Sequence, residues 1–220
     1  AALSGKIEMI LFSINPAFDM MPPSEDLNEY FKEIYDENLG GIAPERAELY
    51  ALCEKNGVGI TVMKGYAGGR LFSAEASPFG VALTPVQCLH YALTRPAVAS
   101  VMVGYDTTEH VDAAVAYENA SEEEKDYASV LAHAPAHAYY GQCTYCGHCA
   151  PCPAGIDIAM VNKLYDLAVM QPEVPATVKA HYQNLAVNGK DCTECKGCEK
   201  RCPFGVNVTD KMKRAAVLFS

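Results

Sequence analysis

The chain has 220 residues, half of them apolar, so it is long enough to bury one good core with a smaller second unit beside it. Its formal net charge of -10 argues against a nucleic-acid partner, because binding phosphates requires a basic surface. No run approaches the roughly 18 apolar residues of a membrane span, and no signal peptide opens the sequence. We therefore expect a cytoplasmic protein with no membrane partner.

Three short apolar runs have the pattern of buried strands, at residues 7–14, 58–63 and 98–103. The first ends at Asn15-Pro16, and a glycine-rich loop follows the second. The segment from Met20 to Gly41 is acidic and has no clean period. We expect it to be an insertion that is at most partly helical.

Helix signals alternate with these strands. Helices are predicted from Pro44 to about Asn56, from Thr84 to about Thr94, and from Thr107 or Thr108 to about Tyr117, and the capping box of Ser121 and Glu124 predicts one more. Such alternation predicts a parallel sheet covered by helices. Three strands fit either a small open sheet or the last part of a closed (β/α)8 barrel, and periodicity alone does not decide between them.

The remainder of the chain is predicted to be mainly helical, with helices at residues 156–170, 177–187 and 209–219. Eight of the ten cysteines lie in the loops of this part, in two groups. The groups are Cys143, Cys146, Cys149 and Cys152, and Cys192, Cys195, Cys198 and Cys202. Because closely spaced thiols in a reducing compartment seldom form structural disulfides, the grouping indicates metal ligation or redox chemistry.

The second group has the spacing C-x2-C-x2-C-x3-C-P, which is associated with 4Fe-4S clusters. The first group is one residue shorter before its fourth cysteine, but both continue alike, as Cys-Pro-Ala-Gly-Ile and Cys-Pro-Phe-Gly-Val. In such runs the fourth cysteine binds the other cluster. The prediction is one cluster on Cys143, Cys146, Cys149 and Cys202, and a second on Cys192, Cys195, Cys198 and Cys152.

Two zinc sites of four cysteines each are the alternative, since C-x2-C pairs also serve zinc. Zinc chemistry does not explain a third cysteine at the same spacing, nor the Cys-Pro in both groups. His148 lies inside the first group and is interpreted as a spacer. Cys53 and Cys88 stand alone on predicted helices and are expected to be small buried apolar residues.

The segments at residues 5–19, 57–71 and 84–114, together with both cysteine groups, resemble the aldo/keto reductases that carry a C-terminal 4Fe-4S ferredoxin-like extension. The resemblance implies a partial TIM-type barrel of three βα units over residues 1–120, a helical connector over 121–142, and a ferredoxin-like dicluster domain over 143–220. In that family the catalytic tetrad lies in earlier βα units. The resemblance therefore gives no catalytic residue in this chain, and activity of the chain itself is uncertain.

The resemblance also implies that part of an NADP site lies after the second and third strands. Its residues would be Lys64, Gly65, Gly68, Gly69, Arg70, Gly104, Thr107 and Thr108. The start of a helix suits an anion, as the adenosine phosphate would require. The alternative is that the glycine loop is only a strand-to-helix turn.

Three functions are weighed. The first is the electron-transfer portion of an aldo/keto reductase-like oxidoreductase, in which two 4Fe-4S clusters relay electrons to or from the barrel or a partner. The partner would be a redox protein, a missing N-terminal barrel half or a second copy of the chain. The others are an NADPH-dependent carbonyl reductase in its own right and a zinc-stabilised interaction module without redox function.

Overall fold

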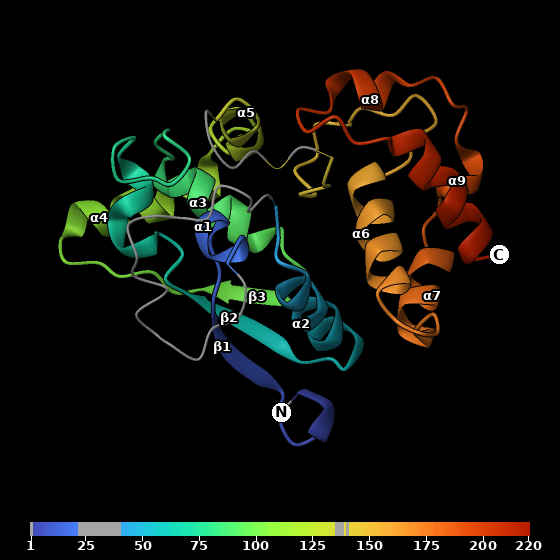
Figure 1. Cartoon of the computed structure of the whole chain (residues 1–220), viewed down its shortest axis with the longest axis horizontal. Helices are drawn as coiled ribbons and strands as arrows, with labels where there is room; N and C mark the ends of the chain where they lie inside the picture. The colour runs from blue at the N-terminus through green and yellow to red at the C-terminus, as the bar shows by residue number, and fades with distance from the viewer. Residues whose placement is uncertain (1, 22–40, 135–138, 140) are drawn as a thin grey trace. The chain divides into compact units, whose positions relative to one another are not determined.

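The computed structural model describes residues 2–21, 41–134, 139 and 141–220. The chain divides into two compact units, Ala1–Tyr139 and Tyr140–Ser220, which we call the α/β unit and the cysteine unit. Figure 1 draws the first from blue to yellow-green and the second from yellow to red. Among the described residues, no helix combines the length and the apolar character needed to cross a lipid bilayer.

The α/β unit contains one parallel sheet with strand order β1-β2-β3. In chain order its elements are η1 (Ala2–Ser4), β1 (Met9–Ser13), α1 (Pro16–Asp19), α2 (Pro44–Lys55), β2 (Gly59–Met63), η3 (Ala67–Phe72), α3 (Pro85–Leu93), β3 (Val98–Val101), α4 (Thr108–Val115), η4 (Ala116–Asn119) and α5 (Tyr127–Ala132). The three predicted strands and the alternating helices α2, α3 and α4 are confirmed. Thr84 and Thr107 cap α3 and α4 through their side chains, because each accepts a bond from the backbone N–H three residues on.

One local prediction fails and one helix was missed. Ser121 and Glu124 do form the reciprocal bonds of a capping box, but no helix follows directly, and α5 begins only at Tyr127 behind the cap Asp126. Helix α1 was not predicted, although Asn15 caps it by accepting from the Phe18 amide at 2.8 Å. Most of the predicted insertion, residues 22–40, lies outside the described residues.

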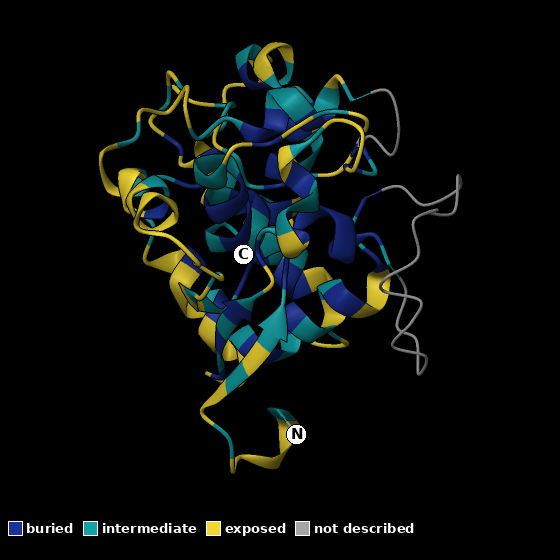
Figure 2. Cartoon of the chain, turned by 90° about the vertical axis from the view of Figure 1, so that its left-hand side faces the viewer, coloured by how far each residue is buried: buried dark blue, intermediate teal, exposed yellow. Residues whose placement is uncertain are grey.

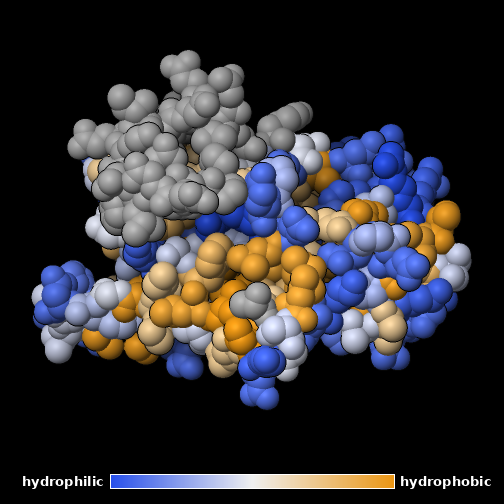
Figure 3. All heavy atoms as spheres, turned by 60° about the horizontal axis from the view of Figure 1, so that its bottom comes forward, coloured by the Kyte–Doolittle hydropathy of each residue, from blue (hydrophilic) through white to orange (hydrophobic). Residues whose placement is uncertain are grey.

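One face of the sheet is buried and the other is partly open. Ile60 and Val62 of β2 are fully buried, whereas Met9 and Leu11 of β1 are each 53% exposed. Figure 2 shows the buried residues gathered in the middle of the unit, and Figure 3 shows hydrophobic residues collected on the side that carries β1. An exposed apolar surface of this kind is typical of an interaction site. Self-association or a missing polypeptide remains a prediction.

The expectation of a partial TIM-type barrel followed by a ferredoxin-like domain is wrong. The described residues form an open sheet of three strands in a small α/β fold, and the cysteine unit has no strand among its described residues. Apolar strand runs have the same pattern in any parallel sheet covered by helices, so they carry no information on closure. Cysteine spacing likewise constrains the ligand loops but not the elements between them.

The cysteine unit is built from helices. They are α6 (Ile158–Val169), α7 (Ala176–Gln183), η5 (Gly189–Asp191), α8 (Gly197–Arg201) and α9 (Val208–Leu218). Helices α6 and α9 pack on each other, and the rings of Tyr182 and Phe219 stack at 4.2 Å between centroids. The predicted helices are confirmed as α6, α7 and α9, while the short helix α8 inside the second cysteine group was not predicted.

Candidate metal centres and a neighbouring cavity

The internal repeat of the sequence becomes a repeat of structure. After each Cys-Pro the chain enters a long helix, α6 after Cys152 and α9 after Cys202. The capping residues Asp157 and Asn207 occupy the same place in the two repeats, and each accepts a bond from the backbone N–H three residues later, at 3.0 and 3.4 Å. Both cysteine groups are therefore held in loops that run directly into capped helices.

Three cysteines of the first group and one cysteine of the second group line a small cavity, which we call cavity A. Its volume is about 20 Å³. The lining includes Cys143, Cys146, Cys149 and Cys202, with Thr144, Tyr145, Gly147, His148, Ala159, Asn162, Phe204, Val206 and Val208. These four cysteines are the set that the crossing rule assigns to one cluster.

The other four grouped cysteines line a second cavity, cavity B, also of about 20 Å³. The lining consists of Cys152, Cys192, Cys195 and Cys198, with Pro153, Ile156, Ile158, Thr193, Lys196, Arg201, Thr209 and Met212. Each cavity thus combines three cysteines of one group with the fourth of the other. All ten cysteines of the chain are free thiols.

Four cysteines line each cavity. Within the described part of the chain, no three or more His, Cys, Asp or Glu side chains are arranged to hold a metal ion. His148 lines cavity A and is half-buried. Cys53 and Cys88 are fully buried in α2 and α3, away from both cysteine groups in the sequence, and burial raises the pKa of the Cys88 thiol to about 12.

Burial disfavours a thiolate in both cavities, since it also raises the pKa of the Cys198 thiol in cavity B. In cavity A, burial raises the pKa of the Cys143 thiol to about 11 and that of Cys149 to about 12. In cavity B, the Gly197 amide, which donates to Cys195, holds the pKa of that exposed thiol below its ordinary value. A metal that binds in cavity A must therefore displace protons that the protein alone retains.

Hydrogen bonds reach two of the sulfur atoms that line cavity A. The side chain of Asn162, which is 1% exposed, donates from Nδ2 to Cys143 Sγ at 3.4 Å. The backbone N–H of Val206 donates to Cys202 Sγ, also at 3.4 Å. Amide donors of this kind stabilise a thiolate and help to set the potential of a cluster bound through it.

Arg201 connects the two cysteine groups. It ends α8 and lines cavity B, and its Nη2 donates to the carbonyl oxygens of Cys149 at 2.6 Å and Pro151 at 2.8 Å. Both carbonyls belong to the loop of the first group. The bonds of one guanidinium therefore fix the relative position of the loops from which each cavity draws its ligands.

A larger cavity lies in the α/β unit, at the ends of β2 and β3. Its volume is about 590 Å³, it is open to solvent, and we call it cavity C. Five of the predicted NADP contacts line it, namely Lys64, Gly65, Gly68, Gly69 and Gly104. Arg70, Thr107 and Thr108 are not among its lining residues. Gly68 and Gly69 have φ of 67° and 84°, so the loop adopts a left-handed conformation that favours glycine.

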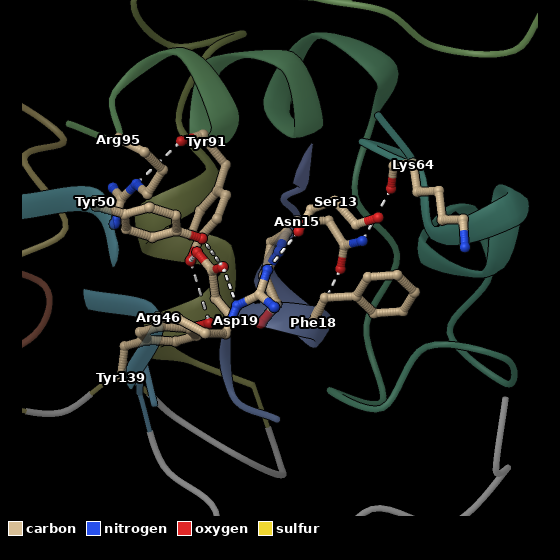
Figure 4. Close-up of polar contacts among 11 residues, drawn as sticks. Ser13, Asn15, Phe18, Asp19, Arg46, Tyr50, Lys64, Tyr91, Arg95 and Tyr139 are labelled. Carbon is tan, nitrogen blue, oxygen red and sulfur yellow. Dashed lines mark hydrogen bonds and ion pairs between the residues drawn. The ribbon is translucent and has the colours of Figure 1, made fainter. Parts of the chain in front are cut away.

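The α/β unit also contains a buried polar cluster that the sequence did not reveal (Figure 4). Asp19 is fully buried and accepts bonds from Arg46 Nε at 3.0 Å, from Tyr91 at 2.7 Å and from Tyr50. Tyr139 is linked to the hydroxyl of Tyr91 at 3.3 Å. No sequence pattern indicated this cluster, because its members are far apart in the chain.

No protein-family model matches the chain, and neither a curated protein nor a solved structure is significantly similar to it.

Proposed function

We propose that the chain is an electron-transfer protein that holds two 4Fe-4S clusters, one in cavity A and one in cavity B. The single observation that carries this proposal is the crossed arrangement of ligands, with three cysteines of one group and the fourth of the other around each cavity. A C-x2-C-x2-C run with a distant fourth cysteine is the pattern of two-cluster proteins. Membership of the aldo/keto reductase family stays a prediction.

The grouping of the cysteines supports a cluster over a zinc ion. Four thiolates on one zinc ion converge to about 2.3 Å from a single point. The thiolates of a 4Fe-4S cluster instead bind four different iron atoms and surround a core of eight atoms. Four cysteines line each cavity, and among the described residues no group of three or more His, Cys, Asp or Glu side chains is arranged around a single metal ion.

When bound, such a cluster supplies a reversible one-electron carrier. The chain's own residues would hold it, exclude water and tune it. Phe204, Val206 and Val208 are buried and line cavity A with apolar side chains, while amide groups approach the sulfur atoms of Cys143 and Cys202. A dry, hydrogen-bonded environment of this kind adjusts the potential of a cluster.

Cavity B is the better place for exchange of electrons with a partner protein. Cys195 is exposed, and so are Lys196, Lys200 and Arg201 of the same loop and helix. A short path through an exposed ligand favours transfer across an interface, and the cations favour an acidic redox partner. This supports a relay that runs between cavity A and an outside protein through cavity B.

The α/β unit supports a second, separate proposal. Cavity C has the size of a small-molecule site, and the backbone of its glycine loop is open to close approach by a ligand. Lys64 contributes a positive charge and Asp106 a negative one. We propose a nucleotide such as NADP as its ligand.

Fluorescence titration of the chain with NADPH tests the proposed ligand of cavity C directly. K64A should weaken binding about tenfold, because it removes a positive charge that an anionic ligand would contact.

Metal analysis of protein purified without oxygen tests the main proposal. We expect about eight iron and eight sulfide per chain, and a brown colour that dithionite bleaches. C202S should remove the cluster of cavity A, lowering iron to about four per chain, because that ligand comes from the other group. C53A is the matched control and should retain all the iron. Stoichiometric zinc with little iron would overturn the proposal.

A further inference from the structure

The repeat around the two cavities contains a pair of equivalent positions with different side-chain chemistry. Counted from the fourth cysteine of each group, Asn162 is ten residues after Cys152 (162 − 152 = 10), and Met212 is ten after Cys202 (212 − 202 = 10). Asn162 lies on α6 and Met212 on α9, the two helices that follow the Cys-Pro sequences. The two positions are therefore equivalent in the repeat.

Both residues have equivalent places in their cavities. Asn162 lines cavity A and Met212 lines cavity B, and each is 1% exposed. A neighbouring pair of equivalent positions follows the same rule, since Ala159 lines cavity A and Thr209 lines cavity B. Thr209 does not imitate Asn162, because its hydroxyl donates to the carboxylate of Glu199. Cavity A alone therefore receives a side-chain amide at this position.

The amide of Asn162 makes a specific contact. Its Nδ2 lies 3.4 Å from Cys143 Sγ, as a donor to the sulfur. An iron-bound thiolate only accepts hydrogen bonds, so the N–H end of the amide is the one that suits it. Methionine has no N–H or O–H to donate, and its thioether is a weak acceptor. Sulfur atoms around cavity B therefore lack the corresponding donor from α9.

The contact with sulfur accounts for Asn162 better than stability does. Its Oδ1 is buried and has no hydrogen-bond partner among the described residues. A buried polar atom without a partner costs about 1–3 kcal/mol, whereas an apolar residue of similar shape would avoid that cost. An asparagine at this place lowers the stability of the protein relative to leucine, and its gain must come from the group it faces.

We propose that Asn162 is a positioning residue that raises the reduction potential of the cluster in cavity A and makes the two clusters inequivalent. The inference rests on the proposed function, because it requires clusters in both cavities. A donor to the thiolate stabilises the reduced state, which carries one more negative charge, more than the oxidised state. Met212 leaves the cluster of cavity B without this stabilisation.

Redox titration of the holoprotein, followed by EPR, tests the proposal with paired variants. N162L removes the donor with little change of volume, and N162M copies the residue of the other repeat. Each variant should lower the midpoint potential of the cluster in cavity A by ~59 mV, which is a tenfold change in the one-electron equilibrium constant. The midpoint potential of the other cluster should stay unchanged. M212N should raise the potential of the second cluster and leave the first.

Iron, sulfide and thermal unfolding are measured on the same samples. Full iron content with unchanged potentials in N162L and N162M would overturn this inference and leave the proposed function intact. Absence of iron from the wild-type chain would overturn the proposed function itself. If N162M binds less iron because methionine does not fit, the midpoint potentials of N162L alone test the inference. An equal shift of both potentials would also contradict the inference, since it would indicate a general change of structure.

Discussion

The two units of the chain solve the burial of polar groups in opposite ways. In the α/β unit the buried carboxylate of Asp19 is satisfied by protein groups, a guanidinium and two tyrosine hydroxyls. In the cysteine unit, burial disfavours the thiolates of Cys143 and Cys149, and Lys211 offsets it only in part at Cys143. The first unit satisfies the buried charge of Asp19 with its own side chains, whereas the second has two cavities bordered by cysteines.

This difference predicts that the stability of one unit is intrinsic and that of the other is conditional. A unit of about 80 residues rarely gains more than about 3–5 kcal/mol from its apolar core alone. Binding of a metal group to preformed cysteines adds free energy that becomes folding free energy. The predictions below are arranged to test this contrast, from the largest expected effect to the smallest.

Removal of the clusters should have the largest effect. Chelation of iron from the holoprotein under mild oxidant, followed by reduction of the thiols, should release the amides of α6 and α9 to rapid hydrogen exchange. The amides of β2 should stay protected, because the α/β unit contains neither cysteine group. Equal protection of both units with and without iron would show that the cysteine unit folds without metal.

Substitution of the buried carboxylate should be the strongest single change in the α/β unit. D19N leaves the positive charge of Arg46 without its partner in a buried site, so we expect a loss of about 3–5 kcal/mol of unfolding free energy. Hydrogen exchange of the β2 amides in increasing denaturant measures it. The matched control is D106N, an exposed partner of His110, which should cost less than about 1 kcal/mol.

D19N should also leave iron content at its wild-type level if the two units are stable independently. Loss of iron in this variant would show that the cysteine unit depends on the α/β unit.

The buried tyrosines predict a loss of stability at high pH, because burial raises the pKa of Tyr50 and Tyr91 well above the ordinary value. They stay protonated in the folded state, so stability should fall as pH rises above about 10, where unfolded tyrosines ionise.

The same contrast explains which features the sequence predicted. Strand runs and helix caps such as Thr84 and Thr107 are local signals, so the order of elements in the α/β unit was predictable. Closure of a sheet is not local, and the barrel prediction failed for that reason. The grouping of cysteines around cavities followed from spacing, but the contact of Asn162 with Cys143 needed the packing of α6 against the first group.

Arg201 offers a smaller test within the cysteine unit. R201A removes the two bonds to Cys149 and Pro151, and because the side chain is exposed we expect a loss of only about 1 kcal/mol. The visible effect should be faster bleaching of the clusters by chelator. K200A, which changes the adjacent exposed residue of α8, is the control and should bleach at the wild-type rate. Equal rates for R201A and wild type would remove the proposed link between the loops.

The smallest effect is the pH dependence that His90 gives to the α/β unit. Burial lowers the pKa of His90 below its ordinary value of 6.5, so the folded state prefers the neutral ring, which contacts the hydroxyl of Tyr117 at 3.0 Å. The unfolded chain takes up the proton first as the pH falls. Stability from this residue is therefore complete above pH 6.5 and declines as the pH falls from there through the folded pKa. Comparison of wild type with H90F at pH 8 and pH 5 measures it, and H90F should lose less stability on acidification, with unchanged iron at pH 8. An equal loss in both proteins would assign the acid sensitivity to other groups.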